Sequence, residues 1–394
     1  MRQNKRLCQN GEMALQVRPC QSEDVEAIHE IWSLTYNDGQ PMEPGKSFRH
    51  CEHFAGLSDG QVAGAFGVMP MTATRGEAIL NSAGVLGVAV APDKRRTGMG
   101  QAMMRYGLRH WRERGFELAG LYAFRETYYR RFGYEAVGTR YRISVDAAAF
   151  PKVKTSLPIR RMGMGDVETI RSCYESFAHR RSGLNLRPDK QWERILNPES
   201  NRTLYVAGDP AEAYAVVQHK VDFWVEQQIA ELVWSSRRGY ETILGLLASI
   251  AMNKSKMIWV EPTDSPFRAL YWEHGAEVAG TSPQSMFRVL NVPKALQALK
   301  PISTGSFSLG IHDDEIPENE GPWRVEFSPA GVHVERCEKA GISMDIRRFA
   351  QALMGEPSLT SLLLNELVQV ADSREAMTAQ SLLPPLPCLC LEMF

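Results

Sequence analysis

Hydrophobic and polar positions in the first 150 residues alternate between two periods, which predicts strands and helices in mixed order. Short apolar runs with the length of buried strands occupy residues 15–18, 61–68, 80–90 and 118–123. Val25, Ile28 and Trp32 recur at helical spacing and predict an amphipathic helix behind the first run. A longer helix is predicted over 98–114, with Gly115 as its end. This order indicates a layered fold of strands and helices.

The pattern then restarts. Residues 157–161 followed by 164–170 repeat the strand-then-helix order of the N-terminus. A strand at 229–234, a helix at 239–251 and a strand at 257–260 follow, which we interpret as a diverged internal duplication. From residue 289 onward, a short helix and several alternating strands predict a small α+β domain. We therefore predict an α+β chain with these parts: a polar tail (1–14), an α/β domain (15–150), a second related domain (151–288) and a small domain (289–394).

Composition and charge narrow the classes of protein. The chain has 394 residues, of which 44% are hydrophobic and 23% are charged, as in soluble globular proteins. Its net charge of −1 argues against general binding to nucleic acid or to anionic membranes. No apolar run approaches the roughly 18 residues of a membrane span, and the polar N-terminus lacks a signal core, so we expect a cytoplasmic protein. The seven cysteines and nine histidines show no ligand spacing, and we expect no metal.

The most informative run joins the end of an apolar strand to the start of the long helix. Backbone N–H groups at a helix start lack internal partners and lie at the positive end of the helix dipole. Gly98 and Gly100 let the backbone approach a pyrophosphate, and Arg95 and Arg96 can donate to phosphate oxygens. The residues expected to bind such a nucleotide-like group are Val88, Ala89, Val90, Arg95, Arg96, Thr97, Gly98, Met99 and Gly100. The alternative is a glycine-rich helix start with solvated arginines.

Two common phosphate-binding motifs do not fit this run. A P-loop needs Gly-Lys-Ser/Thr, and a dinucleotide fold needs Gly-x-Gly-x-x-Gly, whereas Gln101 and Met103 follow the glycines here. The order Arg-x-x-Gly-x-Gly, at Arg95, Gly98 and Gly100, resembles the acetyl-CoA signature of the GNAT N-acetyltransferases. That resemblance implies acetyl-CoA as co-substrate.

A second run, Tyr129-Arg-Arg-Phe-Gly-Tyr134, resembles the Eis-type (enhanced intracellular survival) GNAT enzymes. The chain length and domain order also resemble that family. The resemblance implies a catalytic GNAT domain, a degenerate GNAT-like domain and a sterol-carrier-protein-like domain at 289–394 whose tail reaches the active site. It also implies a homo-oligomer, commonly a hexamer.

The same resemblance assigns catalytic roles. Tyr129 would be the general acid, because a phenol is protonated at neutral pH and can protonate the CoA thiolate. Its neighbour Tyr128 is the competing candidate, and Tyr129 could also serve only in packing. The carboxylate of Phe394 would act as base or orient the amine, with Glu126 and Glu392 as alternative acids.

The middle domain carries a departure from the loop motif. Arg237, Arg238 and Gly239 stand where a second loop would lie, but a large residue replaces the second glycine of the pair, and Tyr240 and Glu241 stand at the helix start. A bulky side chain and an acid there would oppose a pyrophosphate, so we expect no acetyl-CoA site in this domain.

The acceptor is the least defined part of the prediction. The resemblance implies direct acetyl transfer to a primary amine of a polyamine-like small molecule of the aminoglycoside type. A protein lysine acetyltransferase and a non-enzymatic protein that binds an apolar ligand or acyl-CoA are the alternatives. Trp32 and Tyr36, four residues apart, are core residues or part of the wall of the acceptor pocket.

Overall fold

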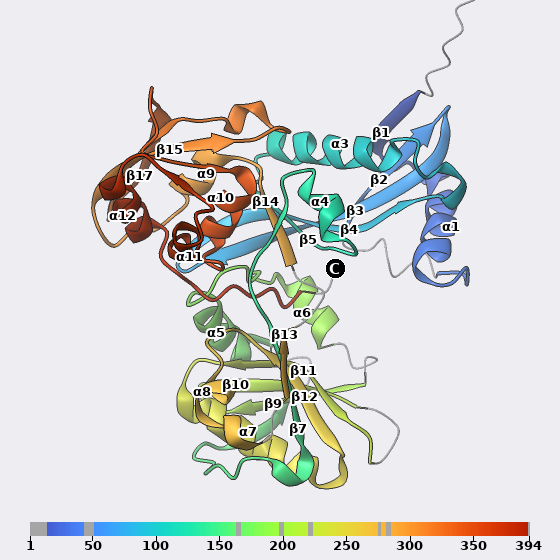
Figure 1. Ribbon diagram of the computed structural model, residues 1–394. Coiled ribbons are helices and arrows are strands. Elements are labelled where there is room, and N and C mark those ends of the chain that lie inside the picture. Colours follow the sequence, from blue (N-terminus) through green and yellow to red (C-terminus); the bar gives the residue numbers. More distant parts are fainter. Residues whose placement is uncertain are drawn as a thin grey trace, which may run out of the picture. The chain divides into compact units, whose positions relative to one another are not determined.

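The computed structural model describes residues 14–42, 51–162, 167–196, 201–219, 224–274, 277–280 and 285–392 (Figure 1). The chain forms two compact units. The first contains the described residues up to Pro70 together with Ala83–Arg114, and the second contains Met71–Ser82 and the described residues from Gly115 to Glu392. Among the described residues, no helix has both the length and the apolar character that crossing a bilayer requires.

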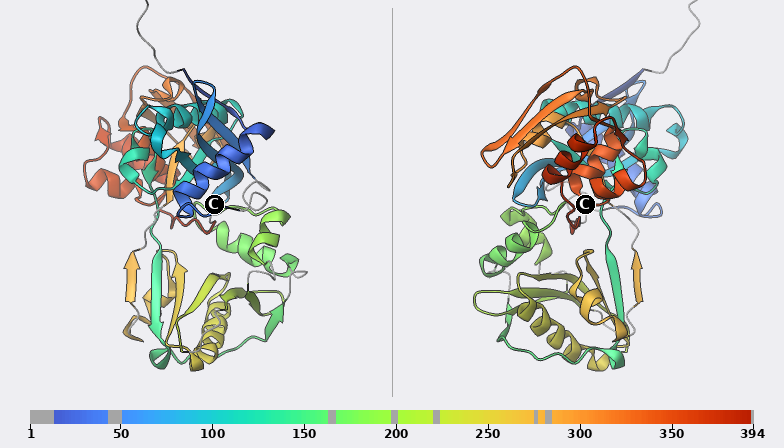
Figure 2. Two further views of the ribbon diagram at one scale, coloured as in Figure 1. Left: turned by 90° about the vertical axis from the view of Figure 1, so that its right-hand side faces the viewer. Right: turned by 60° about the vertical axis from the view of Figure 1, so that its left-hand side comes forward.

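The first unit is a sheet covered by a helix on each face. Its strands are adjacent in the order β1 (Leu15–Pro19), β2 (Glu52–Ser58), β3 (Gln61–Arg75) and β4 (Ala78–Val90), of which β3 and β4 extend into the second unit. Helix α1 (Val25–Tyr36) packs against one face through Ile28, Ile31 and Trp32, and lies across these strands in Figure 2. Two short 3₁₀ turns, Ser22–Asp24 and Pro92–Lys94, precede the helices. The predicted amphipathic helix behind the first strand is confirmed.

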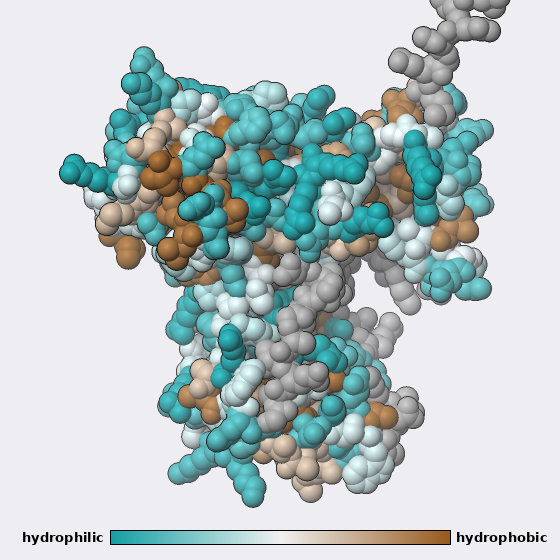
Figure 3. Space-filling view, in the orientation of Figure 1, coloured by the Kyte–Doolittle hydropathy of each residue, from teal (hydrophilic) through white to brown (hydrophobic). Residues whose placement is uncertain are grey.

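Helix α3 (Met99–Glu113) covers the other face, as its apolar stripe predicts. A Cβ at Gly56 would lie 2.5 Å from the sulfur of Met99, and a Cβ at Gly64 would lie 3.0 Å from that of Met103. Strand positions without side chains thus make room for the methionines. The outward side of α3 carries exposed arginines and is mainly hydrophilic (Figure 3).

In the second unit, the sheet strands β5 (Leu118–Tyr122), β14 (Ser285–Val289) and β6 (Glu135–Ala136) are adjacent in that order, with helix α4 (Glu126–Arg130) between β5 and β6 in sequence. Strand β14 pairs antiparallel with both neighbours. It lies in this sheet although it follows the whole middle domain in sequence. The expected boundary at residue 288 therefore does not coincide with a boundary between sheets.

The middle sheet has seven strands: β13 (Glu277–Gly280), β7 (Tyr141–Asp146), β12 (Lys256–Glu261), β11 (Gln227–Trp234), β10 (Ala213–Gln218), β9 (Arg202–Ala207) and β8 (Ile159–Met162). Its helices are α5 (Val167–Ala178), α6 (Asp189–Ile195), α7 (Arg237–Ile250) and α8 (Pro266–Leu270). Strand β7 precedes the expected domain boundary at residue 150 but belongs to the middle sheet. The change from one sheet to the next therefore comes earlier in the chain than expected. Strands β11 and β12 are parallel and α7 connects them, so the strand–loop–helix order of β4 and α3 recurs as the repeat predicts.

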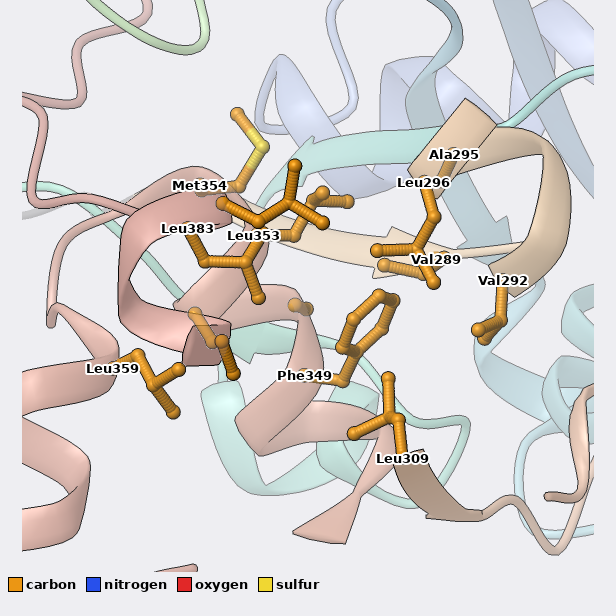
Figure 4. Close-up of a cluster of buried hydrophobic side chains, with 14 of the residues drawn as sticks. Val289, Val292, Ala295, Leu296, Leu309, Phe349, Leu353, Met354, Leu359 and Leu383 are labelled. Carbon is orange, nitrogen blue, oxygen red and sulfur yellow. The ribbon is translucent and has the colours of Figure 1, made fainter. Parts of the chain in front are cut away.

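The last domain is a five-stranded sheet in the order β17 (Gly331–Arg336), β16 (Trp323–Ser328), β15 (Gly305–His312), β18 (Ile342–Asp345) and β19 (Gln369–Val370). Its helices are α9 (Val292–Gln297), α10 (Ile346–Met354), α11 (Leu359–Leu364) and α12 (Ser373–Leu382). Phe349 of α10 lies beside Leu309 of β15 in an apolar core that also includes Leu353 (Figure 4). The predicted small α+β domain is confirmed.

Candidate functional site

The loop between β4 and α3 is tightly turned. It passes through the 3₁₀ turn Pro92–Lys94, and both Arg96 (φ 66°) and Gly98 (φ 94°) adopt left-handed backbone conformations before α3 begins at Met99. The hydroxyl of Thr97 donates to the carbonyl of Lys94 over 2.8 Å and braces the turn. A left-handed arginine costs about 1–2 kcal/mol, and such strain is concentrated in functional loops.

This loop fits an anionic group. Gly98 caps α3 without a side chain, and the first turn carries no acid, so no carboxylate of that turn competes for its N–H groups. A Cβ at Gly98 would meet only Leu15, at 3.6 Å, so the turn rather than packing requires glycine there. Arg95 and Arg96 are exposed, although Arg95 Nε donates to the carbonyl of Val90 over 3.2 Å. The residues present therefore suit the pyrophosphate of a CoA ester.

The strand that leads into the loop is kinked. Ala89 is buried, and Val88 and Val90 are half-buried at the end of β4. Gly87 has a φ of 60°, which a regular strand does not contain. The sequence prediction missed this kink, for which a glycine within an apolar strand is the available signal.

Tyr129 lies inside an aromatic cluster. Its side chain is 3% exposed, and its ring centroid lies 5.1 Å from Tyr128, 5.6 Å from Phe124 and 6.1 Å from Tyr134. Tyr128 is half-buried, and burial raises the pKa of its hydroxyl. A neutral phenol at either position is a proton donor at pH 7. The two tyrosines thus differ in burial.

The alternative acids are held by arginines. Glu126 accepts from Arg130 over 2.8 Å, and Arg130 also donates to the buried Glu135 over 2.8 Å. Glu392 accepts from the fully buried Arg187 over 2.6 Å. Both carboxylates are therefore committed to ion pairs within the second unit.

The C-terminal tail is anchored along its described length. Tyr122, at the end of β5, donates its hydroxyl to the carbonyl of Cys390 over 3.1 Å. Leu389 N donates to Ser182 O over 2.9 Å, and Cys388 N donates to Glu356 over 2.8 Å. The tail thus passes the strand that leads to α4 and Tyr129. Phe394, whose carboxylate the sequence analysis assigned a role, lies outside the described residues.

The start of α7 binds a carboxylate of the chain itself, whereas the first turn of α3 carries no acid. Glu212 accepts from Ser236 Oγ, at 2.5 Å, and from Arg238 Nε, at 2.7 Å. Ser236 caps α7 by accepting from Gly239 N over 3.0 Å, and a Cβ on Gly239 would lie 2.5 Å from the Glu212 carbonyl oxygen. A carboxylate of the chain itself is therefore bound at the start of α7.

The expectation of no acetyl-CoA site there stays a prediction, and the side chains on which it was based lie elsewhere. Tyr240 is buried and donates to Glu261 over 2.6 Å, and Glu241 pairs with Arg237 over 2.9 Å. Neither side chain obstructs the helix start as expected. The obstruction comes from Glu212, which is remote in sequence.

Comparisons with known proteins agree with this architecture. Residues 16–137 match the family model of the acetyltransferase (GNAT) domain, and residues 292–390 match that of the sterol carrier protein domain. N-acetyltransferase Eis of Mycobacterium bovis is 26% identical over 240 residues, which cover 57% of this chain and 59% of that relative. The matched region thus spans about three fifths of that curated relative's length.

Two solved structures share the fold. A conserved protein of Enterococcus faecalis, described as a probable N-acyltransferase, superposes with a TM-score of 0.87 at 20% identity, covering 97% of this chain and 100% of that one. Eis1 of Mycobacterium abscessus superposes with a TM-score of 0.79 at 19% identity, covering 96% and 100% of the two chains. At these identities the structures establish the fold alone.

Proposed function

Because the chain is an Eis-type member of the GNAT family, we propose that it is an acetyl-CoA-dependent N-acetyltransferase acting on primary amines of small, polyamine-like acceptors of the aminoglycoside type. The observation that carries this proposal is the loop between β4 and α3. Its left-handed turn at Gly98, exposed arginines and acid-free helix start suit the pyrophosphate of acetyl-CoA. The corresponding loop before α7 is filled by Glu212.

The reaction is a direct transfer. The neutral amine attacks the acetyl carbonyl, a C–N bond forms, and the carbonyl oxygen takes up negative charge that a backbone amide at Val88–Val90 stabilises. The C–S bond then breaks with its electron pair on sulfur, and Tyr129 gives the departing thiolate a proton. The nitrogen releases its extra proton to water, from which the Tyr129 phenolate is reprotonated. Arg95, Arg96, Thr97, Gly98, Met99 and Gly100 hold the co-substrate in this proposal. The role assigned to the Phe394 carboxylate and the cytoplasmic location stay predictions.

The proposal also includes a homo-oligomer, as the family resemblance implies. Apolar side chains on the surface of the last domain support it. Leu364 of α11 is 80% exposed and Leu367 is 45% exposed, and hydrophobic residues gather over α10 and α11 (Figure 3). Sedimentation velocity of the purified chain tests this part of the proposal.

The acceptor class is tested by release of CoA thiol. Four amines are supplied at equal concentration with acetyl-CoA: an aminoglycoside, a linear polyamine, an arylalkylamine and a lysine peptide. Mass spectrometry identifies the acetylated products. The proposal expects the highest kcat/KM with the aminoglycoside or the polyamine. A preference for the lysine peptide favours the protein acetyltransferase, and no release with any amine favours the non-enzymatic binding protein.

A further inference from the structure

The turn that follows Tyr129 closes helix α4. Phe132 N donates to the carbonyl of Tyr129 over 2.9 Å, and Gly133 N donates to the carbonyl of Arg130 over 3.1 Å. These bonds use carbonyls that the end of a helix leaves without partners. The orientation of α4, and with it the place of the Tyr129 side chain, therefore depends on where this turn is held.

The turn is held first from below Gly133. Gly133 has a φ of 79°, and a Cβ there would lie 2.8 Å from Arg288 Nε and 2.9 Å from Ile346 Cγ2, at the start of α10. The side chain of Arg288, in β14, is 0% exposed and donates to both oxygens of Asp313, over 2.6 and 2.8 Å. Asp313 also accepts from Asn319 Nδ2 over 2.8 Å. The turn thus rests on a guanidinium that the last domain fixes by a bidentate pair.

A second set of contacts lies beside Glu135. Its buried carboxylate accepts from Arg130 of α4 over 2.8 Å and lies 3.7 Å from Arg348 of α10. Arg348 also donates to Gln351 over 2.8 Å, and Gln351 Nε2 donates to the carbonyl of Ala136 over 3.0 Å. Because Arg348 and Gln351 are three residues apart, one face of α10 binds both the side chain and the backbone of β6.

We propose that the last domain serves acetyl transfer by holding Tyr129 in place, with Arg288 and Arg348 as positioning residues. The inference rests on the proposed function, in which the Tyr129 hydroxyl protonates the departing thiolate. A general acid has to lie within hydrogen-bond reach of the group it protonates, and a misplacement of about 1 Å can cost about 10²-fold in rate. The charged contacts on both sides of the turn after α4 supply that precision.

The test compares two neighbouring arginines of α10. Arg348→Gln removes the charge beside Glu135, whereas Arg347→Gln removes one whose hydrogen bonds go to Asp345, the cap of the same helix. The two side chains are 29% and 41% exposed, so both variants should stay folded. Arg348→Gln should lower kcat about 10-fold with both KM values within about twofold, and Arg347→Gln should match the wild type.

A third variant tests the contact at Gly133. Arg288→Lys keeps a cation beside Asp313 but removes the planar guanidinium from beneath the turn, and it should lower kcat about 10- to 100-fold. Arg288→Lys and Arg348→Gln are also made in Tyr129→Phe. Because positioning acts through the Tyr129 hydroxyl, each should lower the kcat of Tyr129→Phe by less than about twofold. A merely structural role would lower kcat by the same factor with or without that hydroxyl.

The outcomes separate positioning from general damage. Equal losses with and without the Tyr129 hydroxyl would overturn the inference, and so would wild-type turnover in both arginine variants or an equal loss in Arg347→Gln. If melting curves show that Arg288→Lys does not fold, Arg348→Gln decides. Wild-type turnover in Tyr129→Phe would overturn the inference together with the general acid, while the acetyltransferase function would stand. A wild-type protein that acetylates no amine would refute the proposed function itself.

Discussion

Replacement of Arg187 by methionine should strongly destabilise the second unit, because it leaves two buried carboxylates without their cation. The Arg187 side chain is 0% exposed and donates to both oxygens of Glu231, over 2.8 and 2.6 Å, and to Glu392 over 2.6 Å. Its guanidinium also lies 4.4 Å from the Tyr174 ring centroid. The ion network thus joins strand β11 to the C-terminal tail.

The magnitude follows from this burial. Breaking a buried ion pair by removing one partner costs about 3–5 kcal/mol. In a domain of this size, each kcal/mol lost from the free energy of unfolding lowers the melting temperature by about 2–4 °C. The melting temperature should therefore fall by about 6–20 °C. The apolar methionine stem fills part of the space of the arginine, so the loss is electrostatic rather than a cavity effect.

Thermal melting at pH 7 measures this loss with two controls. Arg237→Met removes an ion pair whose arginine is 72% exposed, and it should shift the melting temperature by no more than about 1 °C. Adding Glu231→Gln and Glu392→Gln to Arg187→Met should recover much of the loss, because no unpaired charge remains. A melting temperature for Arg187→Met within about 2 °C of the wild type would refute this reasoning.

The pH dependence of the same network has a defined sign. Burial is the largest single influence and acts to raise the pKa of Glu231, but the Arg187 guanidinium and the Tyr214 hydroxyl together outweigh it, and the pKa lies below its ordinary value. A depressed carboxyl pKa contributes stability above the unfolded pKa of about 4.3, and that contribution is lost as the pH falls through the folded pKa. The difference in melting temperature between the wild type and Glu231→Gln should therefore narrow as the pH falls below about 4.3.

Three further predictions concern the site. Tyr129→Phe should lower kcat about 10²–10⁴-fold in a thiol-release assay while Tyr128→Phe changes it little; the reverse result would move the general acid to Tyr128. Gly98→Val should abolish acetyl-CoA binding in calorimetry, whereas Gly60→Val, at a φ of 83° with no neighbour within 4 Å, imposes similar strain and should leave binding intact. Glu212→Ala should lower the melting temperature by freeing Arg238 and Ser236, without changing the turnover number; loss of turnover would give the middle domain a direct part in the reaction.

The features that could be predicted from the sequence are those encoded by local patterns of residues. The stripe of α3, the loop from Arg95 to Gly98 and the alternating strands of the last domain depend on residues near one another in the chain. The insertion of β14 beside β5 could not be predicted, because strand pairing between residues 118–122 and 285–289 has no local signal.

The site shows the same division. The loop between β4 and α3 could be predicted from the spacing of its arginines and glycines, and its binding role stays a prediction. The contact of Glu212 with the start of α7 was missed, since its partners lie more than 20 residues along the chain. The hydrogen bonds from α1 to the carbonyls of β4 were missed for the same reason. Trp32 and Tyr36 form an ordinary helical pair in the sequence, and only the fold brings them to the carbonyls of Gly87 and Val88.

Calorimetric titration of the wild-type chain with acetyl-CoA decides whether the loop between β4 and α3 forms the acetyl-CoA site. We expect saturable binding of one acetyl-CoA per chain, unchanged in Glu212→Ala and lost in Gly98→Val. No binding by the wild type, two sites per chain, or full binding by Gly98→Val would contradict this expectation.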